Sequence, residues 1–382
     1  MKKFLISIYK CFYKCSLLLF YFFPIRKNKI VILRDWGLGY GCNMKYLAEY
    51  IISKKLPFEI VWILNAYDKD MPTQIKQVKL SRIKSVYELS TAKFVFSSVK
   101  FKIPVKKSKN QYYIYIPHGQ AGAKPCLDEI PLKDDFRKLA MEHSAIQDLF
   151  VASSAFQAKD FADYYWCKCE ILRSGYPRND IYFQENNTLK SKIRKNLNIP
   201  NDYNVALWAP TFRDNGETAP YSLDINRIIQ VLEKNNKGKW LFLVRLHPNL
   251  RFWYKKPIIN FSNIIKDVTD YPDIQELFLI SDIVITDYSS TMFDFALTRK
   301  PVFLYATDID DYIQMRGLKD LYFKTPFPLC RDDEELELAI NSFDMAIYQK
   351  NLDEFYAIYN PYDEGRASEK IVEKMNMVNG NI

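Results

Sequence analysis

One histidine of the chain lies where a parallel α/β sheet would place a reactive group. His118 follows the short apolar run 113–116, which we expect to form a strand, and Gly119 and other small residues come directly after it. In open α/β sheets, ligands bind beyond the carboxyl ends of the strands. An imidazole there could remove a proton from an attacking hydroxyl group near neutral pH. The sequence equally allows a histidine that only forms a hydrogen bond within its loop.

A cluster of hydroxyl groups marks a second candidate site. Ser289 and Ser290 follow the predicted strand 283–286, just before the apolar spacing lengthens toward that of a helix. The free N–H groups and the positive dipole end of a helix N-terminus favour a bound anion. Thr291 and Asp294 have the spacing of a capping box, so these residues could instead only cap the helix.

Basic residues follow two more predicted strands of the C-terminal half. Arg213 comes shortly after the run 205–209, and Arg245 and His247 lie at the end of the run 240–246. Because the carboxyl ends of parallel strands meet at one edge of a sheet, these side chains and the serines should gather there. Three cationic or potentially cationic groups beside a helix N-terminus suit a doubly charged group such as a pyrophosphate. A cleft between two α/β domains is the expected position for a nucleotide-linked donor.

A further arginine follows a predicted strand of the N-terminal half. The stretch 171–180 has the pattern of a strand followed by a turn that contains glycine and proline. We expect Arg178 to emerge from this turn toward the cleft, although an arginine on the protein surface explains the same pattern.

The apolar runs predict two α/β domains with parallel sheets. Runs of strand length alternate with helix-like stretches, and we expect helix throughout 133–165. The 382 residues, 48% of them hydrophobic and 26% charged, suffice for two cores of ordinary size. We expect an N-terminal domain over 29–185 and a C-terminal domain over 186–382, joined within the polar stretch 184–204.

Composition restricts the partners of the protein. A net charge of +9 and a pI near 8.9 suggest an anionic partner, but the mixture of aromatic and basic residues typical of a single-strand nucleic-acid surface is missing. Seven scattered cysteines without a nearby histidine pair predict neither a zinc site nor a disulfide framework, and free thiols indicate a reducing compartment. No carboxylate pair with metal-ligand spacing accompanies the basic cluster, so we expect no essential metal and no cofactor.

The N-terminal segment has a composition of its own. The first 29 residues contain seven Lys or Arg and no acidic residue, with aliphatic and aromatic residues between them. Lys10 and Lys14 interrupt the apolar stretch, which is therefore too short to span a hydrocarbon core of roughly 30 Å. We expect residues 1–28 to form an amphipathic helix that lies on an anionic membrane surface, which would place the protein peripherally at the cytoplasmic face of the cell membrane. The alternative is a first helix that packs against the domain.

Six short motifs resemble those of the CDP-glycerol glycerophosphotransferase family, the teichoic acid and related capsule polymerases and primases. The motifs are PHGQAGAK at 117–124, GYPRND at 175–180, APTFRD at 209–214, RLHPN at 245–249, DVTDYPDI at 267–274 and ITDYSSTMFDFA at 285–296. The last four, in this order and spacing, are specific, and the resemblance covers roughly residues 37–322.

The resemblance implies a GT-B-like pair of Rossmann-type domains that face a cleft, association with one side of a membrane, and transfer of an alditol phosphate from a CDP-linked donor. It implies that His118 is the general base and that His247, as a second catalytic residue, and Arg213 face the donor pyrophosphate. The double serine would bind phosphate, and the loop that contains Thr269 would lie near the nucleotide. The positions implied in substrate binding are Gly119, Arg178, Pro210, Thr211, Arg213, Arg245, Thr269, Ser289, Ser290 and Asp294.

We therefore expect an enzyme that transfers glycerol phosphate from CDP-glycerol to a hydroxyl group of a lipid-linked or polymeric cell-surface glycan and releases CMP. The alternatives are a CDP-ribitol donor, a nucleotide-sugar glycosyltransferase of the same architecture, and a non-catalytic protein that binds anionic membranes. Many family members have a Thr-Pro-Leu run where this chain has residues 120–123. The sequence thus does not decide between polymerisation and addition of one unit, nor the acceptor or the oligomeric state.

Overall fold

The structure is a computed structural model of the chain and describes residues 23–80, 83–99, 107–119, 122–126, 129, 133–166, 168–213, 219–236, 238–247 and 259–380. The described chain divides into two compact units, each built on one sheet. Unit 1 contains the described residues of 1–118, 127–180 and 362–382, and unit 2 contains those of 119–126 and 181–361.

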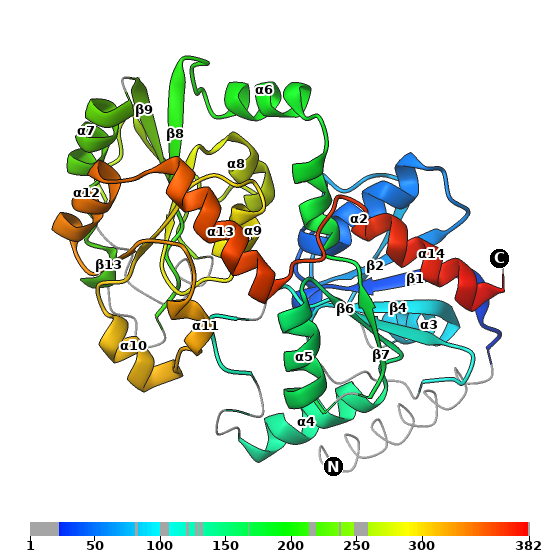
Figure 1. The fold of residues 1–382 in the computed structure, drawn as a ribbon. Helices are drawn as coiled ribbons and strands as arrows, with labels where there is room; N and C mark the ends of the chain where they lie inside the picture. Colours follow the sequence, from blue (N-terminus) through cyan, green and yellow to red (C-terminus); the bar gives the residue numbers. More distant parts are fainter. Residues whose placement is uncertain are drawn as a thin grey trace, which may run out of the picture. The chain divides into compact units, whose positions relative to one another are not determined.

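Unit 1 has a seven-stranded sheet in the order β3-β2-β1-β4-β5-β6-β7, and all neighbouring strands are parallel (Figure 1). The strands are β1 (Arg26–Leu33), β2 (Glu59–Leu64), β3 (Ile75–Lys79), β4 (Ala92–Ser97), β5 (Tyr112–Tyr115), β6 (Leu149–Ala152) and β7 (Glu170–Arg173). The helices are η1 (Asp35–Gly37), α2 (Cys42–Ser53), α3 (Lys84–Thr91), α4 (Asp134–Ala145), α5 (Ala155–Tyr164) and α14 (Ala367–Asn379), and η3 (Pro177–Phe183) crosses into unit 2. The strand order changes direction between β1 and β4, where α/β sheets bind ligands.

Both faces of the unit 1 sheet are apolar, because successive strand residues point to opposite sides. Ile30 and Ile32 of β1 belong to one buried cluster, and Val31 and Leu33 belong to another. Helices α2 and α14 complete the first cluster, and α3 contributes Leu89 to the second. The continuous apolar runs in the sequence therefore become central strands that are covered on both faces.

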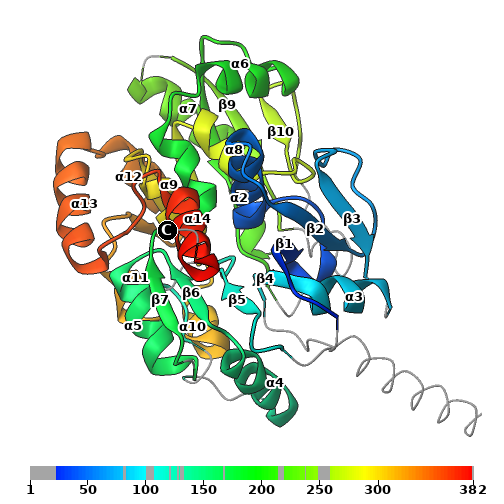
Figure 2. The ribbon, with the colours of Figure 1, turned by 90° about the vertical axis from the view of Figure 1, so that its right-hand side faces the viewer.

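The C-terminal helix α14 lies with unit 1, whereas the sequence prediction placed residues 186–382 in the second domain. Figures 1 and 2 show α14 beside α2, and Ile371 and Met375 enter the core cluster of unit 1. The Asp180 carboxylate accepts hydrogen bonds from the backbone N–H groups of Ala367 and Ser368, at 2.8 and 2.9 Å. These contacts satisfy free donors at the first turn of α14 and hold the helix on unit 1.

Unit 2 has a six-stranded parallel sheet in the order β10-β9-β8-β11-β12-β13. The strands are β8 (Tyr203–Trp208), β9 (Lys239–Val244), β10 (Ile265–Asp267), β11 (Ile283–Thr286), β12 (Val302–Tyr305) and β13 (Leu329–Cys330). The helices are α6 (Asn187–Asn196), η4 (Ala219–Tyr221), α7 (Ile225–Asn236), α8 (Ile274–Ile280), α9 (Thr291–Ala296), α10 (Ile309–Arg316), α11 (Asp320–Phe323), α12 (Asp333–Asn341) and α13 (Met345–Tyr359). This strand order is that of the Rossmann fold, with its change of direction between β8 and β11.

Two further predictions need correction. The stretch 133–165 is not one helix, because β6 separates α4 from α5. The four apolar residues of β6, which we had assigned to a helix, are all buried and pair with β5 and β7. The predicted membrane segment 1–28 ends inside β1, which begins at Arg26, and its residues 1–22 lie outside the described part of the chain. Among the described residues, no helix has the length and apolar character needed to cross a membrane.

Candidate active site

Most of the predicted binding residues of unit 2 follow its strands at the carboxyl edge of the sheet. Arg213 comes after β8, Arg245 and His247 after β9, Thr269 after β10, and Ser289 and Ser290 after β11. Strands β9, β8 and β11 are direct neighbours in the sheet, so the topology gathers these residues around the change of strand direction. The prediction that they share one edge is confirmed.

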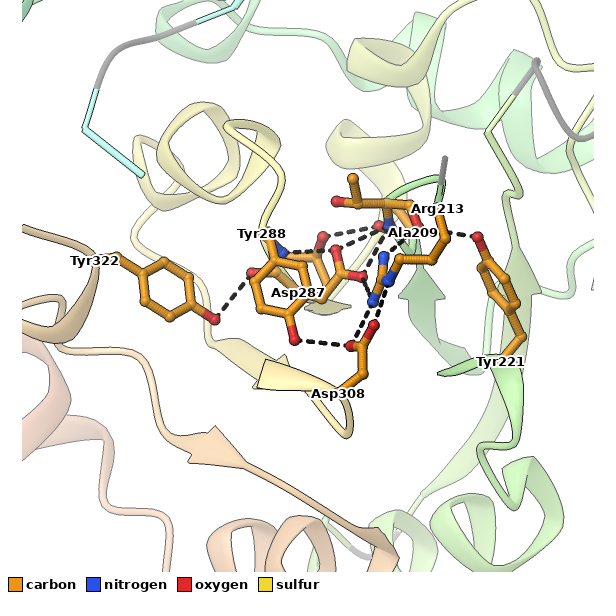
Figure 3. A network of polar contacts seen from close by, with 9 residues as sticks. Ala209, Arg213, Tyr221, Asp287, Tyr288, Asp308 and Tyr322 are labelled. Carbon is orange, nitrogen blue, oxygen red and sulfur yellow. Dashed lines mark hydrogen bonds and ion pairs between the residues drawn. The ribbon is translucent and has the colours of Figure 1, made fainter. Parts of the chain in front are cut away.

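Arg213 is the centre of a buried polar network at this edge (Figure 3). Its side chain is 2% exposed, and its Nε and Nη2 groups donate to the two carboxylate oxygens of Asp308 at 2.6 and 2.8 Å. Asp287 Oδ2 lies 3.0 Å from Arg213 Nη2, and Nη1 donates to the Thr211 carbonyl oxygen at 2.5 Å. The guanidinium therefore ties together the exits of β8, β11 and β12.

Aromatic rings enclose the same guanidinium. The rings of Tyr288 and Tyr312 stack with centroids 3.7 Å apart, and Arg213 lies 4.9 Å from the first and 5.4 Å from the second. The Tyr288 hydroxyl donates to Asp308 at 2.8 Å, and the Tyr322 hydroxyl donates to the Asp287 carbonyl at 3.3 Å. Cation–π contacts with Arg213 thus join Tyr288 and Tyr312 to the ion pairs. Tyr288 and Arg213 also share Asp308 as an acceptor.

The environment of Arg213 differs from the one that the resemblance implied. We expected a guanidinium that faces the donor pyrophosphate, but two carboxylates already balance its charge inside the protein. Burial alone would lower the pKa of Arg213, yet Asp308 and Asp287 outweigh it and the net shift is upward. Arg213 therefore holds the strand exits in place. No local pattern indicates this contact, because Asp308 lies far along the chain and only the sheet brings it near Arg213.

The loops after β9 and β10 are fastened to each other. Arg245 Nη1 donates to the carbonyl oxygens of Val268 and Tyr271 at 3.1 and 2.5 Å, and Thr269 Oγ1 accepts from the Leu246 N–H at 3.0 Å. Thr269 is buried, so its hydroxyl serves this connection. Arg245 is half-buried. The two residues fix the position of the chain from which His247 projects.

His247 is an accessible basic group at this edge. Its side chain is exposed and its ring stacks on Phe212 with centroids 5.6 Å apart. Phe212 lies between Thr211 and Arg213, so the exit of β8 supports the histidine that follows β9. Residues 248–258 of the RLHPN motif and beyond lie outside the described part of the chain.

The serine cluster lies at a helix N-terminus, as predicted, but the capping box is not formed. Ser290 is the N-cap of α9 without a side-chain cap bond, and Ser289 Oγ accepts from the Thr291 N–H at 3.3 Å. Asp294 is buried and accepts from Gln275 Nε2 of α8 at 3.4 Å, so it faces the interior of unit 2. Both serines are half-buried and remain at the surface of the carboxyl edge.

Two hydroxyl groups at this edge have unused hydrogen-bonding capacity. Thr211 Oγ1 and Thr291 Oγ1 are buried and have no hydrogen-bond partner among the described residues. Pro210, which precedes Thr211, is also buried, and the neighbouring Ala209 carbonyl accepts from Thr286 Oγ1 at 2.7 Å. A buried hydroxyl without a partner is costly, and a ligand bound at this edge could supply the missing bond to these two groups.

The described residues 119 and 122–126, in the second half of the PHGQAGAK motif and just after it, belong to unit 2. A Cβ atom on Gly119 would lie 3.4 Å from Ser290 Oγ, and one on Gly122 would lie 2.9 Å from Leu321 Cδ2. The Lys319 N–H donates to the Ala123 carbonyl at 3.0 Å. Gly122 has φ +128°, which a residue with a side chain rarely adopts, so a glycine is needed there for two reasons. His118 therefore directly precedes a residue, Gly119, that lies beside the N-cap of α9.

His118 itself belongs to unit 1, after β5. Its side chain is 65% exposed, and its Nδ1 atom lies 3.8 Å from Asp35 Oδ1. The backbone around it is held by Arg178, whose Nη1 donates to the His118 carbonyl oxygen, and by Asn43, which donates to the Pro117 carbonyl at 3.0 Å. The alternative of an arginine on the protein surface is excluded for Arg178. Its side chain is buried, and Nη1 also contacts Cys42 Sγ at 3.3 Å.

The described residues contain no group of three or more His, Cys, Asp or Glu that could hold a metal ion. The strand exits of the two units carry the imidazoles of His118 and His247, hydroxyl groups and backbone N–H groups. Such groups accept a proton, hydrogen-bond to phosphate oxygens and stabilise negative charge. They suit transfer of a phosphoryl group between oxygen atoms.

The whole-chain comparison agrees with the motifs. Residues 15–376 match the family described as CDP-Glycerol:Poly(glycerophosphate) glycerophosphotransferase. The chain belongs to this family. Family membership covers both units and makes the protein a transferase related to enzymes of teichoic acid synthesis.

Individual relatives include teichoic acid polymerases. The chain is 26% identical to the teichoic acid poly(glycerol phosphate) polymerase of Bacillus spizizenii, over 92% of each protein. It is 29% identical to the poly(ribitol-phosphate) polymerase of the same organism, over 92% of this chain but 56% of that enzyme. The chain thus spans little more than half the length of some relatives.

Among solved structures, the wall teichoic acid polymerase TagF is similar throughout. The TM-score is 0.84 at 26% identity, with 99% of this chain and 96% of that chain covered. A histidine-to-asparagine variant of TagF soaked with CDPG matches with a TM-score of 0.81, at 26% identity and over 94% of this chain and 90% of that chain. The α/β fold with parallel sheets is therefore shared with TagF.

Proposed function

We propose that the protein transfers glycerol phosphate from CDP-glycerol to a hydroxyl group of a lipid-linked or polymeric cell-surface glycan and releases CMP. Membership of the glycerophosphotransferase family over residues 15–376 supports the reaction class. The similarity to glycerol-phosphate polymerases and to TagF supports glycerol as the alditol.

The position of Gly119 carries this proposal. Gly119 lies against Ser290 at the carboxyl edge of unit 2, and the preceding residue is His118. A phosphate bound at Ser289 and Ser290 would therefore lie near Gly119, and the residue before Gly119 is the proposed base. Transfer from a bound donor to an incoming hydroxyl group requires that the base lie close to the bound phosphate.

The proposed reaction is an in-line displacement at the phosphorus that carries glycerol. The acceptor oxygen forms a bond to this β-phosphorus while the bond to the bridging oxygen breaks, and CMP leaves with the bonding electrons. The proton of the acceptor hydroxyl passes to His118. His247, the two serines and nearby backbone N–H groups would stabilise the charge that develops on the phosphate oxygens.

The finer architecture belongs to the same proposal. We infer that the two units face each other across a cleft, as in GT-B enzymes, with the donor held by unit 2 and the acceptor approaching from unit 1. The buried network of Arg213, Asp287 and Asp308 would hold the strand exits that form the donor site, without contacting the donor itself.

A donor panel tests the reaction directly. Purified protein is incubated with CDP-glycerol, CDP-ribitol or a set of UDP-sugars together with a glycerol-phosphate-primed acceptor, and the released nucleotide is quantified. Release of CMP from CDP-glycerol, with a smaller rate from CDP-ribitol, is expected. Faster turnover of CDP-ribitol would reassign the donor, and UDP release would replace the proposal by a glycosyltransferase. Absence of nucleotide release with every donor would favour a non-catalytic membrane-binding protein.

Residues 1–22 are proposed to hold the protein at an anionic membrane surface on the cytoplasmic side. Each lysine near such a surface contributes about 1 kcal/mol, so replacing both Lys10 and Lys14 with Gln should weaken binding to anionic vesicles by about 30-fold. The measurement is co-sedimentation with vesicles that contain one-third phosphatidylglycerol. The matched control replaces Lys192 and Lys195, which are exposed on α6. Equal partitioning of the two double variants would contradict the anchor.

A further inference from the structure

Asp35 has a backbone conformation that side-chain-bearing residues seldom adopt. It begins η1 directly after β1 and has φ +42°. Aspartate and asparagine tolerate this left-handed region better than most residues, but it still carries a conformational cost. A position of this kind, at the strand where the sheet changes direction, is typical of functional loops.

Ser98 and Arg34 hold the Asp35 carboxylate in place. The Asp35 N–H donates to Ser98 Oγ at 3.0 Å, and the same hydroxyl donates to Asp35 Oδ1 at 2.8 Å. Arg34 Nε lies 3.0 Å from Asp35 Oδ2. The carboxylate is only 13% exposed, so the Ser98 hydrogen bonds and the ion pair with Arg34 fix its direction. Rotation toward solvent would break both of its anchors.

The fixed carboxylate oxygen is directed at the imidazole of His118. Asp35 Oδ1, which accepts from Ser98, lies 3.8 Å from His118 Nδ1. The three residues follow β1, β4 and β5, which are adjacent strands in the sheet. Hydrogen bonds of catalytic groups are often long before substrate binds and shorten when charge develops. The spacing suits a contact that strengthens once the imidazole is protonated.

The charges around the ring explain its protonation. Burial among protein atoms lowers the pKa of His118, Arg178 and Arg34 lower it further, and Asp35 and a hydrogen bond with the Ser98 backbone raise it. The lowering contributions outweigh the raising ones, so the net pKa of His118 lies below its ordinary value. The imidazole is neutral, and can accept a proton, at pH 7.

We propose that Asp35 is the positioning residue of the general base. It holds the proton on His118 Nδ1, which leaves the Nε2 lone pair free for the acceptor hydroxyl. When that proton arrives on Nε2, the Asp35 carboxylate stabilises the positive imidazolium that results. This inference rests on the proposed function, in which His118 is the base, and it adds a residue that the motif resemblance did not assign.

Replacement of Asp35 by Asn tests the inference without disturbing the loop, because Asn adopts the left-handed region as readily as Asp. The chain has three histidines, so ¹⁵N imidazole spectra of the full-length protein give three sets of signals, and a His118→Asn spectrum assigns His118. In D35N the pKa of His118 should fall and the proton should no longer favour Nδ1. The kcat for CMP release should fall by about 10- to 100-fold with CDP-glycerol binding unchanged, and the acidic limb of the pH profile should move to lower pH.

The control variant is Asp163→Asn, which removes an exposed carboxylate of unit 1 on α5. It should leave both the His118 titration and kcat at parental values. A D35N protein with parental His118 titration and tautomer overturns the inference, whether or not kcat falls, since a rate loss alone would be structural. A shifted titration with parental kcat overturns it as well. If the parent releases no CMP at all, the proposed function fails, and the spectra still report on the contact between Asp35 and His118.

Discussion

Replacing His118 with alanine is expected to lower the rate of CMP release from CDP-glycerol by at least about 10²-fold. A positioned general base contributes roughly 10²–10⁴-fold to a proton transfer, and His143, the other histidine of unit 1, is buried. The proposed donor-binding residues belong to unit 2, so CDP-glycerol should bind H118A with nearly parental affinity in calorimetry. Loss in kcat with unchanged donor affinity is the signature of a group that acts in the transition state.

The pH dependence of the parent gives an independent check on this role. The pKa of His118 is lowered from its ordinary value of about 6.5, so the neutral base persists to slightly acidic pH. The kcat/KM for CMP release should therefore be constant near neutrality and decline only as the pH falls below about 6.5. The H118A variant should lack this decline. Parental turnover in H118A, or an identical acidic limb in both proteins, would reject His118 as the base.

Replacing Arg213 with alanine is expected to lower the free energy of unfolding by about 3–5 kcal/mol. The substitution leaves the Asp287 and Asp308 carboxylates buried without the cation that balances them, which is the costly way to break a buried ion pair. It also removes a cation from the Tyr288–Tyr312 stack. The measurement is urea unfolding at pH 7, followed by the tryptophan fluorescence of the protein.

Arg227 supplies the matched control, because it also pairs with two carboxylates, Glu334 and Glu337. That cluster lies on the surface between α7 and α12, where water and salt screen the charges. R227A should therefore lose little stability. Equal losses in R213A and R227A would contradict the view that burial makes the Arg213 network structurally important.

Acid should reduce the difference between R213A and the parent. Burial raises the pKa of Asp308, but the hydrogen bonds and charge of Arg213 outweigh it, so the pKa in the folded protein lies below the usual 3.8. A carboxylate with a lowered folded pKa stabilises the protein above its unfolded pKa, and this contribution disappears as the pH falls through the folded value. The stability difference should be full at pH 7 and should shrink below about pH 4. A difference that grows on acidification would show that another group dominates.

The parallel-sheet architecture could be predicted because its signal is local. The run 283–286 is the whole of β11, and 113–116 overlaps β5 except for one residue at each end. Strands of parallel sheets are covered on both faces and so form continuous apolar runs. The predictions for β6 and α14 were wrong because a local signal was missing there. The four residues of β6 form too short a run to be separated from the helices around it, and α14 returns to unit 1 through contacts that no local pattern records.

The sequence by itself determined which residues stand at the strand exits, since a residue that follows a strand must lie at the edge where that strand ends. It thereby located His118, Arg213, His247 and the two serines. Only the tertiary structure decided what each side chain contacts. The burial of Arg213 between Asp287 and Asp308, and the approach of Asp35 to His118, depend on strands that are distant in the chain and adjacent in the sheet. The adjacency of the strands determines which ion-pair and hydrogen-bond partners each side chain has. The reason is that electrostatic interactions depend on distance in space and not on separation along the chain.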